Sequence, residues 1–102
     1  MAKKDENIDF IEAKDLACEN LEAIRMSLVR CVDEGMMDLE DSLYNQILGL
    51  LDDAAILSTW DEMEALVDKA KVLEQDIAAW LSMHGRTSYS LPWPKKPGPS
   101  LF

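Results

Sequence analysis

Apolar residues recur along the first third of the chain with the 3.6-residue period of an amphipathic α-helix. Within residues 8–34 the successive spacings are seven, four, three, four and three residues. The positions concerned are Phe10, Ala17, Leu21, Ile24, Leu28 and Cys31. Asp9 with Glu12 is a candidate capping box at the start, and Gly35 is a candidate helix-ending residue. The pattern predicts one long helix, preceded by a frayed polar segment at residues 1–7.

A second helix is predicted over residues 38–57, and its apolar face is wide. One apolar stripe consists of Leu43, Ile47, Leu50, Ala54 and Leu57, and an adjacent second stripe consists of Tyr44, Leu48, Leu51 and Ala55. Two stripes exceed what one packed face requires, so we expect this helix to be central in a bundle or covered by another chain. Gly49 costs a helix about 1 kcal/mol relative to Ala. We therefore expect a neighbouring backbone to approach closely at Gly49.

A third helix is predicted to begin near Trp60 and to end before Gly85. Thr59 with Glu62 three residues later forms a capping box for its start. Its periodic positions are Met63, Leu66, Val67, Ala70, Leu73, Ile77, Trp80, Leu81 and His84. The joint with the second helix is so short that one kinked rod is the alternative to two helices. We expect an all-α fold, an antiparallel three-helix bundle or a long helical hairpin, over residues 8–85.

The composition changes abruptly after the third helix. Residues 86–102 contain all four prolines, three basic residues and no acid. Proline fixes φ and removes a backbone donor, so we expect an extended, proline-rich C-terminal arm. Leu91 and Trp93 are its candidate partner-binding residues, and they either dock into a groove of a partner or fold back on the bundle. Strand addition by residues 87–91 and docking of the PxxP at residues 94–97 are further alternatives.

The formal net charge of -10, from twenty acidic and ten basic residues, narrows the function classes. A binder of bare nucleic acid needs cations to displace phosphate counterions, so we expect no direct nucleic-acid binding. Residues 1–84 carry a formal charge of -13 and the arm carries +3. An acidic stripe, whose members share one face of the first helix, consists of Glu12, Asp15, Glu19 and Glu22. The stripe is either a solvated outer face or a docking surface for a basic partner.

Residues that carry catalytic or metal chemistry are scarce. The single histidine, His84, is placed at a helix C-terminus, where the dipole favours a cation. Cys18 and Cys31 lie thirteen residues apart on one predicted helix, or roughly 20 Å, whereas a disulfide needs Cα atoms within about 7 Å. We therefore expect no enzyme activity, no metal and no cofactor, and reduced thiols in a cytoplasmic protein. No signal sequence and no membrane-spanning run is predicted.

These features together favour a small acidic interaction module that covers part of another protein, as an adaptor, chaperone or inhibitor. The predicted partner-binding residues are Tyr44, Leu48, Leu51, Ala55, Leu91 and Trp93. We expect the partner to be another protein, in a homodimer or a heteromer. In size, acidity and helix content the sequence is similar to small chaperones of specialised bacterial secretion systems. The alternatives are a nucleic-acid mimic that inhibits a DNA- or RNA-binding protein through the acidic stripe, and a self-assembling structural subunit.

Overall fold

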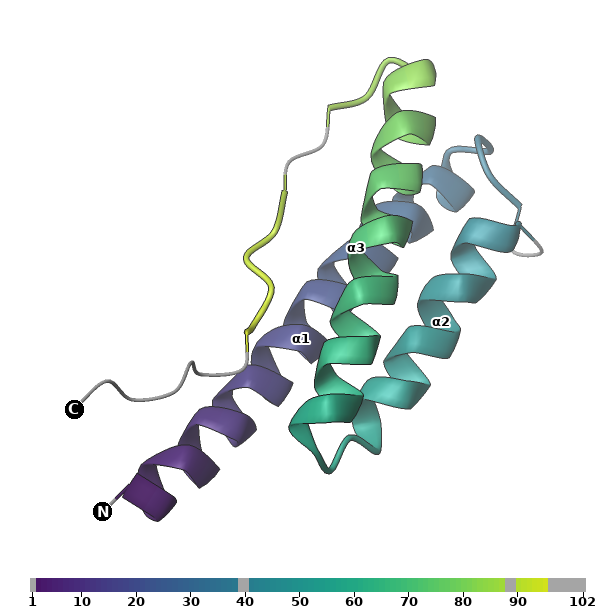
Figure 1. The fold of residues 1–102 in the computed structure, drawn as a ribbon. Helices are drawn as coiled ribbons and strands as arrows, with labels where there is room; N and C mark the ends of the chain where they lie inside the picture. Colours follow the sequence, from purple (N-terminus) through teal and green to yellow (C-terminus); the bar gives the residue numbers. More distant parts are fainter. Residues whose placement is uncertain (1, 39–40, 88–89, 96–102) are drawn as a thin grey trace.

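Three helices pack against each other and an irregular arm follows them (Figure 1). The computed structural model describes residues 2–38, 41–87 and 90–95, with side chains from Phe10 onward. The helices are α1 (Ala2–Asp33), α2 (Ser42–Ala55) and α3 (Trp60–Met83). In Figure 1, α1 and α3 run in one direction and α2 runs in the other. The predicted all-α class is confirmed, and the second and third helices are separate.

The start of α1 differs from the prediction. We expected residues 1–7 to lie outside the helix, but α1 already includes Ala2 and runs through the predicted capping box at Asp9 and Glu12. The first residues of the helix are mostly Ala, Lys and Glu, which have high helix propensity. Residues 2–33 contain neither Gly nor Pro, so nothing in the sequence interrupts the helix. Figure 1 shows the first turns of α1 extending past the joint between α2 and α3.

The ends of the helices are fixed by local capping contacts. Gly35 and Gly85 both have positive φ, 78° and 73°, which confirms them as helix-ending residues. Helix α2 begins later than predicted because Asp41 is its N-cap, with a carboxylate oxygen accepting from the backbone N–H of Leu43 at 2.9 Å. The capping box of α3 is confirmed, since Thr59 and Glu62 each accept from the backbone N–H of the other at 3.1 Å.

The core consists of apolar residues from the inner faces of the three helices, with Met37 and Leu57 from the segments that join them. Its buried members are Ala13, Ala17, Leu21, Ile24, Leu28, Cys31, Met37, Tyr44, Ile47, Leu50, Ala54, Leu57, Met63, Leu66, Val67, Ala70, Leu73, Ile77 and Leu81. Leu21, Leu28 and Ile47 are fully buried, and each such side chain stabilises the fold by about 1.5–3 kcal/mol. The periodic positions predicted at Phe10, Leu43 and Trp80 are partly buried against this core.

The N-terminal half of α1 is attached to the joint between α2 and α3. The rings of Phe10 and Trp60 meet edge to face with centroids 5.4 Å apart. One turn further along α1, the Lys14 ammonium donates to the carbonyl oxygen of Leu57 at 3.0 Å. That carbonyl lies two residues beyond the end of α2, in the joint before α3. These contacts set the register of the long helix against the other two.

The expectation for Gly49 is wrong. A Cβ at this position would meet no atom of the described residues within 4 Å, so no backbone approaches it. Gly49 instead lines an open groove of about 560 Å³ between α2 and α3, together with Leu50, Val72 and Leu73. The absence of a side chain at Gly49 leaves open space at the surface, and no neighbouring segment packs into that space among the described residues.

Candidate protein-interaction surfaces

The C-terminal arm returns along the bundle and contacts both α1 and α3 (Figure 1). Its described residues, 86–87 and 90–95, are neither helix nor strand, as predicted for a proline-rich segment. Figure 1 shows the arm beside α3 on the side away from α2. The predicted edge strand at 87–91 and the PxxP at 94–97 both include residues outside the described part of the chain.

Polar contacts attach the arm at three successive points. At its start, Arg86 forms an ion pair with Glu34, just beyond α1, and its guanidinium also donates to the sulfur of Met36 at 3.4 Å. Further along, the backbone N–H of Leu91 donates to the carboxylate of Glu74 on α3 at 3.0 Å. The side-chain amide of Asn20 on α1 then donates to the backbone carbonyl of Pro92 at 2.8 Å.

The apolar groups of the arm pack against the core of its own chain. Leu91 and Trp93 are both half-buried and contact the core cluster. The indole Nε1 of Trp93 is buried and has no hydrogen-bond partner among the described residues. A groove of about 450 Å³ lies between α1, α3 and the arm, and small side chains such as Ala23, Ser27 and Ala78 line it. The arm therefore lies along the surface between α1 and α3 and forms one wall of this open space; we call the surface that it covers, which includes Asn20 and Glu74, the arm groove.

Asn20 and Glu74 belong to this site, and the sequence interpretation did not name them. Asn20 is 5% exposed and is the one buried polar residue among those whose burial is described. The available signal was its spacing, three residues after Ala17 and four before Ile24, which places a polar side chain on the core face of α1. Buried polar groups need hydrogen-bond partners, and Pro92 supplies this one. Glu74 carried no such signal, because acids also occur on every solvated helix face of this chain.

The second stripe of α2 becomes more exposed toward the end of the helix. Tyr44 is buried, Leu48 and Leu51 are half-buried against the core cluster, and Ala55 is exposed. The bundle therefore covers part of the wide apolar arc. The four residues share a face by their helical spacing, and the uncovered portion runs from Leu48 to Ala55.

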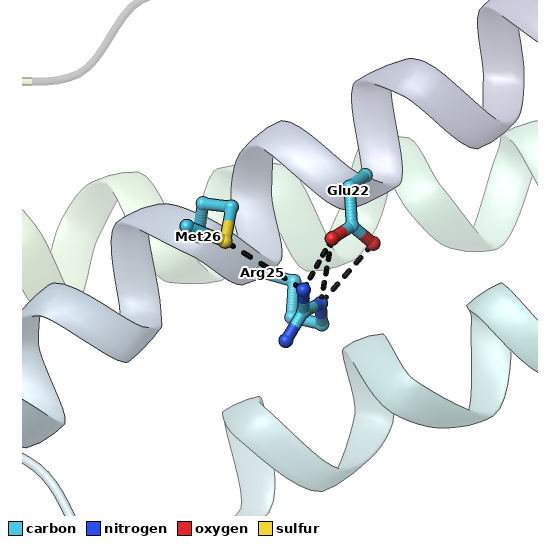
Figure 2. A network of polar contacts seen from close by, with 3 residues as sticks. All are labelled: Glu22, Arg25 and Met26. Atoms are coloured by element: carbon cyan, nitrogen blue, oxygen red, sulfur yellow. Dashed lines mark hydrogen bonds and ion pairs between the residues drawn. The ribbon is translucent and has the colours of Figure 1, made fainter.

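The acidic stripe lies on the outer face of α1. Glu12, Asp15, Glu19 and Glu22 are all exposed, as predicted for carboxylates aligned on one helix face. Figure 2 shows Glu22 paired with Arg25, whose Nε lies 3.1 Å from both carboxylate oxygens.

Arg25 connects the acidic stripe to the second stripe. Its hydrogen bonds to Glu22 hold the pKa of that carboxyl below its usual value, and Glu22 in turn raises the pKa of the guanidinium. Tyr44 adds a smaller contribution to the raised pKa of Arg25. The guanidinium also donates to the sulfur of Met26 at 3.6 Å (Figure 2). Met26 is 45% exposed. Acidic and apolar side chains therefore meet along the seam between α1 and α2.

The remaining candidate groups for chemistry have structural surroundings. His84 stacks on Trp80 with ring centroids 4.0 Å apart, and its Nδ1 lies 2.8 Å from the carbonyl oxygen of Trp80. Cys18 and Cys31 are both free, and burial raises the pKa of the Cys18 thiol. Among the described residues, no three His, Cys, Asp or Glu side chains gather closely enough to hold a metal ion. None of the described helices is both long enough and apolar enough to span a membrane.

Comparisons with known proteins give no relative from which to carry over a function. No family model, no curated protein and no solved structure matches the chain. The surfaces described above, the seam between α1 and α2 and the arm groove, are therefore the basis for the proposals that follow.

Proposed function

We propose that this chain is a small acidic interaction module, an adaptor, chaperone or inhibitor, that acts by covering part of the surface of another protein. The observation that carries the proposal is the seam between α1 and α2. There the uncovered part of the second stripe, from Leu48 to Ala55, lies on α2, which packs against α1. The acidic stripe follows the outer face of α1 alongside.

The side chains of the seam have the composition of a protein interface. Such interfaces combine an apolar centre with a polar rim that excludes water. Leu48 and Leu51 supply half-buried apolar area, and Met26, at 45% exposure, adds a flexible apolar side chain. Glu19 and Glu22 are exposed on the same helix as Met26 and supply a charged rim. The rim favours a partner that presents Lys or Arg around an apolar patch.

The pairing of Glu22 with Arg25 supports this proposal over nucleic-acid mimicry. A mimic needs a row of unpaired carboxylates in place of phosphates, whereas Glu22 is already neutralised by a cation from its own helix. The same Arg25 also donates to the sulfur of the exposed Met26, so the charge pattern here belongs to a mixed surface. We propose no catalytic role. Two thiols thirteen residues apart on α1, both free, support action in a reducing compartment such as the cytoplasm.

The proposal is tested by affinity capture with matched variants of the full chain. Ala55→Glu places a charge in the exposed end of the second stripe, and Val72→Glu places the same charge at a 60% exposed apolar site between α2 and α3. We expect Ala55→Glu to lose a protein that the wild type and Val72→Glu both retain. Retention by all three chains contradicts the proposal.

A third variant separates the interaction module from the mimic. Replacing Glu12, Asp15 and Glu19 by Gln, Asn and Gln removes three exposed charges and no apolar contact. The interaction module predicts that capture survives this change and survives moderate salt, because the apolar centre dominates. The mimic predicts that capture is lost with the charges and falls steeply as salt rises.

A further inference from the structure

The arm groove recognises the main chain of its occupant. Glu74 accepts from the backbone N–H of Leu91, and Asn20 donates to the backbone carbonyl of the next residue, Pro92. Because the N–H of Leu91 and the C=O of Pro92 bond to two different helices, neither group is available for a helix within the arm. Proline favours such a non-helical segment. Leu91 and Trp93, on either side of Pro92, add the apolar contacts. The groove is therefore built for an extended peptide with an apolar–Pro–aromatic sequence.

The charges of the arm and the bundle are complementary. The bundle, residues 1–84, carries -13, and the arm carries +3. At the one arm cation whose partner is described, Arg86, the partner is an acid of the bundle, Glu34. This attraction does not depend on which copy of the chain supplies the arm.

The exposed residues that follow the α3 cap allow the arm to leave its groove without disturbing the helices. The chain reverses at Gly85, whose φ is +73°, and a Cβ there would meet no atom of the described residues within 4 Å. The backbone N–H of Arg86 donates to the carbonyl oxygen of Leu81 at 2.8 Å, so Gly85 keeps its cap conformation and the direction of the arm can change beyond Arg86. Thr87 and Ser90, on the connecting segment, are exposed.

One donor of the docked arm lacks a partner in the part of the chain that the structure describes. The Nε1 of Trp93 is buried with no acceptor among the described residues, and burying an unpaired N–H weakens the docked state. Release of the arm returns this group to water. The unpaired Nε1 of Trp93 therefore lowers the free energy that is needed to release the arm.

We propose that the arm groove also accepts the arm of a second copy, so that two chains exchange arms. An exchanged dimer repeats every contact of the closed monomer, with Leu91, Pro92 and Trp93 supplied by the other chain. The tethered arm competes at an effective concentration on the order of millimolar, so the wild type is mostly closed at micromolar concentration. Exchange becomes measurable as the protein concentration approaches that range. This inference does not depend on the seam between α1 and α2.

Two full-length variants test the exchange by complementation. The arm variant carries Leu91→Ala and Trp93→Ala and keeps the groove intact. The groove variant carries Asn20→Ala and Glu74→Ala and keeps the arm intact. Neither can close on itself well, but the arm of the groove variant fits the groove of the arm variant. We expect the mixture to form a heterodimer with a dissociation constant about tenfold or more below that of either variant alone, because the tethered competitor has been removed.

Analytical ultracentrifugation with one fluorescently labelled partner measures the heterodimer. The proposal is overturned if the mixture shows no heterodimer at a protein concentration of about half the effective concentration of the tethered arm. A dimer of equal strength in each separate variant also overturns it, because the contact then lies elsewhere. Circular dichroism establishes that both variants are folded. If the buried Asn20→Ala fails to fold, Glu74→Ala alone serves as the groove variant, since Glu74 is only partly buried and Ala favours the helix.

Discussion

The side-chain amide of Asn20 donates a hydrogen bond of 2.8 Å to the backbone carbonyl of Pro92, 72 residues further along the chain. Asn20 is 5% exposed on the core face of α1. A buried amide without a partner costs about 1–3 kcal/mol, so this bond strongly favours one position of the arm. The same bond offsets the cost of burying the polar side chain of Asn20 among Ala17, Leu21 and Ile24.

Replacing Asn20 by Ala is expected to loosen the arm and to destabilise the fold. The Pro92 carbonyl loses its donor, and we expect the free energy of unfolding to fall by about 1–3 kcal/mol. For a domain of this size, each kcal/mol corresponds to about 4–8 °C in Tm. Hydrogen exchange at the Leu91 amide, measured beside thermal unfolding, should accelerate. Glu19→Ala, at an exposed site on the same helix outside the arm groove, is the control, and equal behaviour of the two variants contradicts the assignment.

At Trp93, we expect one smaller side chain to leave the free energy of unfolding unchanged or higher. Its Nε1 is buried without an acceptor in the described part of the chain, so Trp93→Phe removes an unpaired donor and keeps an aromatic ring against the core. We expect the stability of Trp93→Phe to lie within about 0.5 kcal/mol of the wild type or above it. Trp93→Ala should lose about 1–2 kcal/mol with the apolar contact. Urea unfolding compares the three, and equal losses for Phe and Ala would mean that the N–H is satisfied.

The features predicted correctly from the sequence are those that neighbouring residues determine. Helical spacing identified Ala17, Leu21 and Leu28 as core positions because one packed face repeats every three or four residues. The capping box of Thr59 and Glu62 was equally local, since its two members lie within one helical turn. Such features need no knowledge of how the helices meet.

The features that the sequence did not predict depend on contacts between distant segments. Two polar contacts of the arm could not be predicted from sequence spacing, because their members are far apart in the chain. They are the bond of Glu74 with Leu91 and the ion pair of Arg86 with Glu34. The expectation for Gly49 failed for the same reason, because only the packing of α2 on α3 decides what approaches it. For Leu91 the sequence left docking on a partner or on the bundle open, and in the structure it packs on its own bundle.

Gly49 should be a site where a single methyl group stabilises the protein. It lies inside α2, it is exposed, and an added Cβ meets nothing within 4 Å among the described residues. Ala in a helix interior is favoured over Gly by about 1 kcal/mol, so Gly49→Ala is expected to raise the stability by about that amount.

Gly35 and Gly85 are the matched controls for this substitution. Both also have open space around a new Cβ, but their φ values are +78° and +73°. Ala at either position is strained by the backbone, so we expect both variants to lose stability in the same denaturation experiment. A gain at Gly35 or Gly85, or a loss at Gly49→Ala, would contradict this account.

Glu62 makes the stability of the α3 N-terminus depend on pH. Its carboxylate accepts from the backbone N–H of Ser58 at 3.0 Å, the Ser58 hydroxyl at 2.9 Å and the backbone N–H of Thr59 at 3.1 Å. These bonds, with that of the Ser58 N–H foremost, lower the pKa of the group below its ordinary value of 4.5. The folded state therefore favours the ionised carboxylate more than the unfolded state does.

The resulting stability is present above the ordinary pKa and is lost as the pH falls through the lowered pKa of the folded state. Glu62→Gln keeps an acceptor of the same shape without the charge, so we expect it to be less stable than the wild type at pH 7. The difference should shrink as the pH falls from 4.5 through the lowered pKa of the folded state, because the wild-type carboxyl then becomes neutral as well. Thr59→Ala, which removes the reciprocal cap, should cost about 1 kcal/mol at both pH values. Urea unfolding of the three chains at pH 7 and near pH 3 measures this, and a pH-independent difference for Glu62→Gln would show that its charge does not contribute.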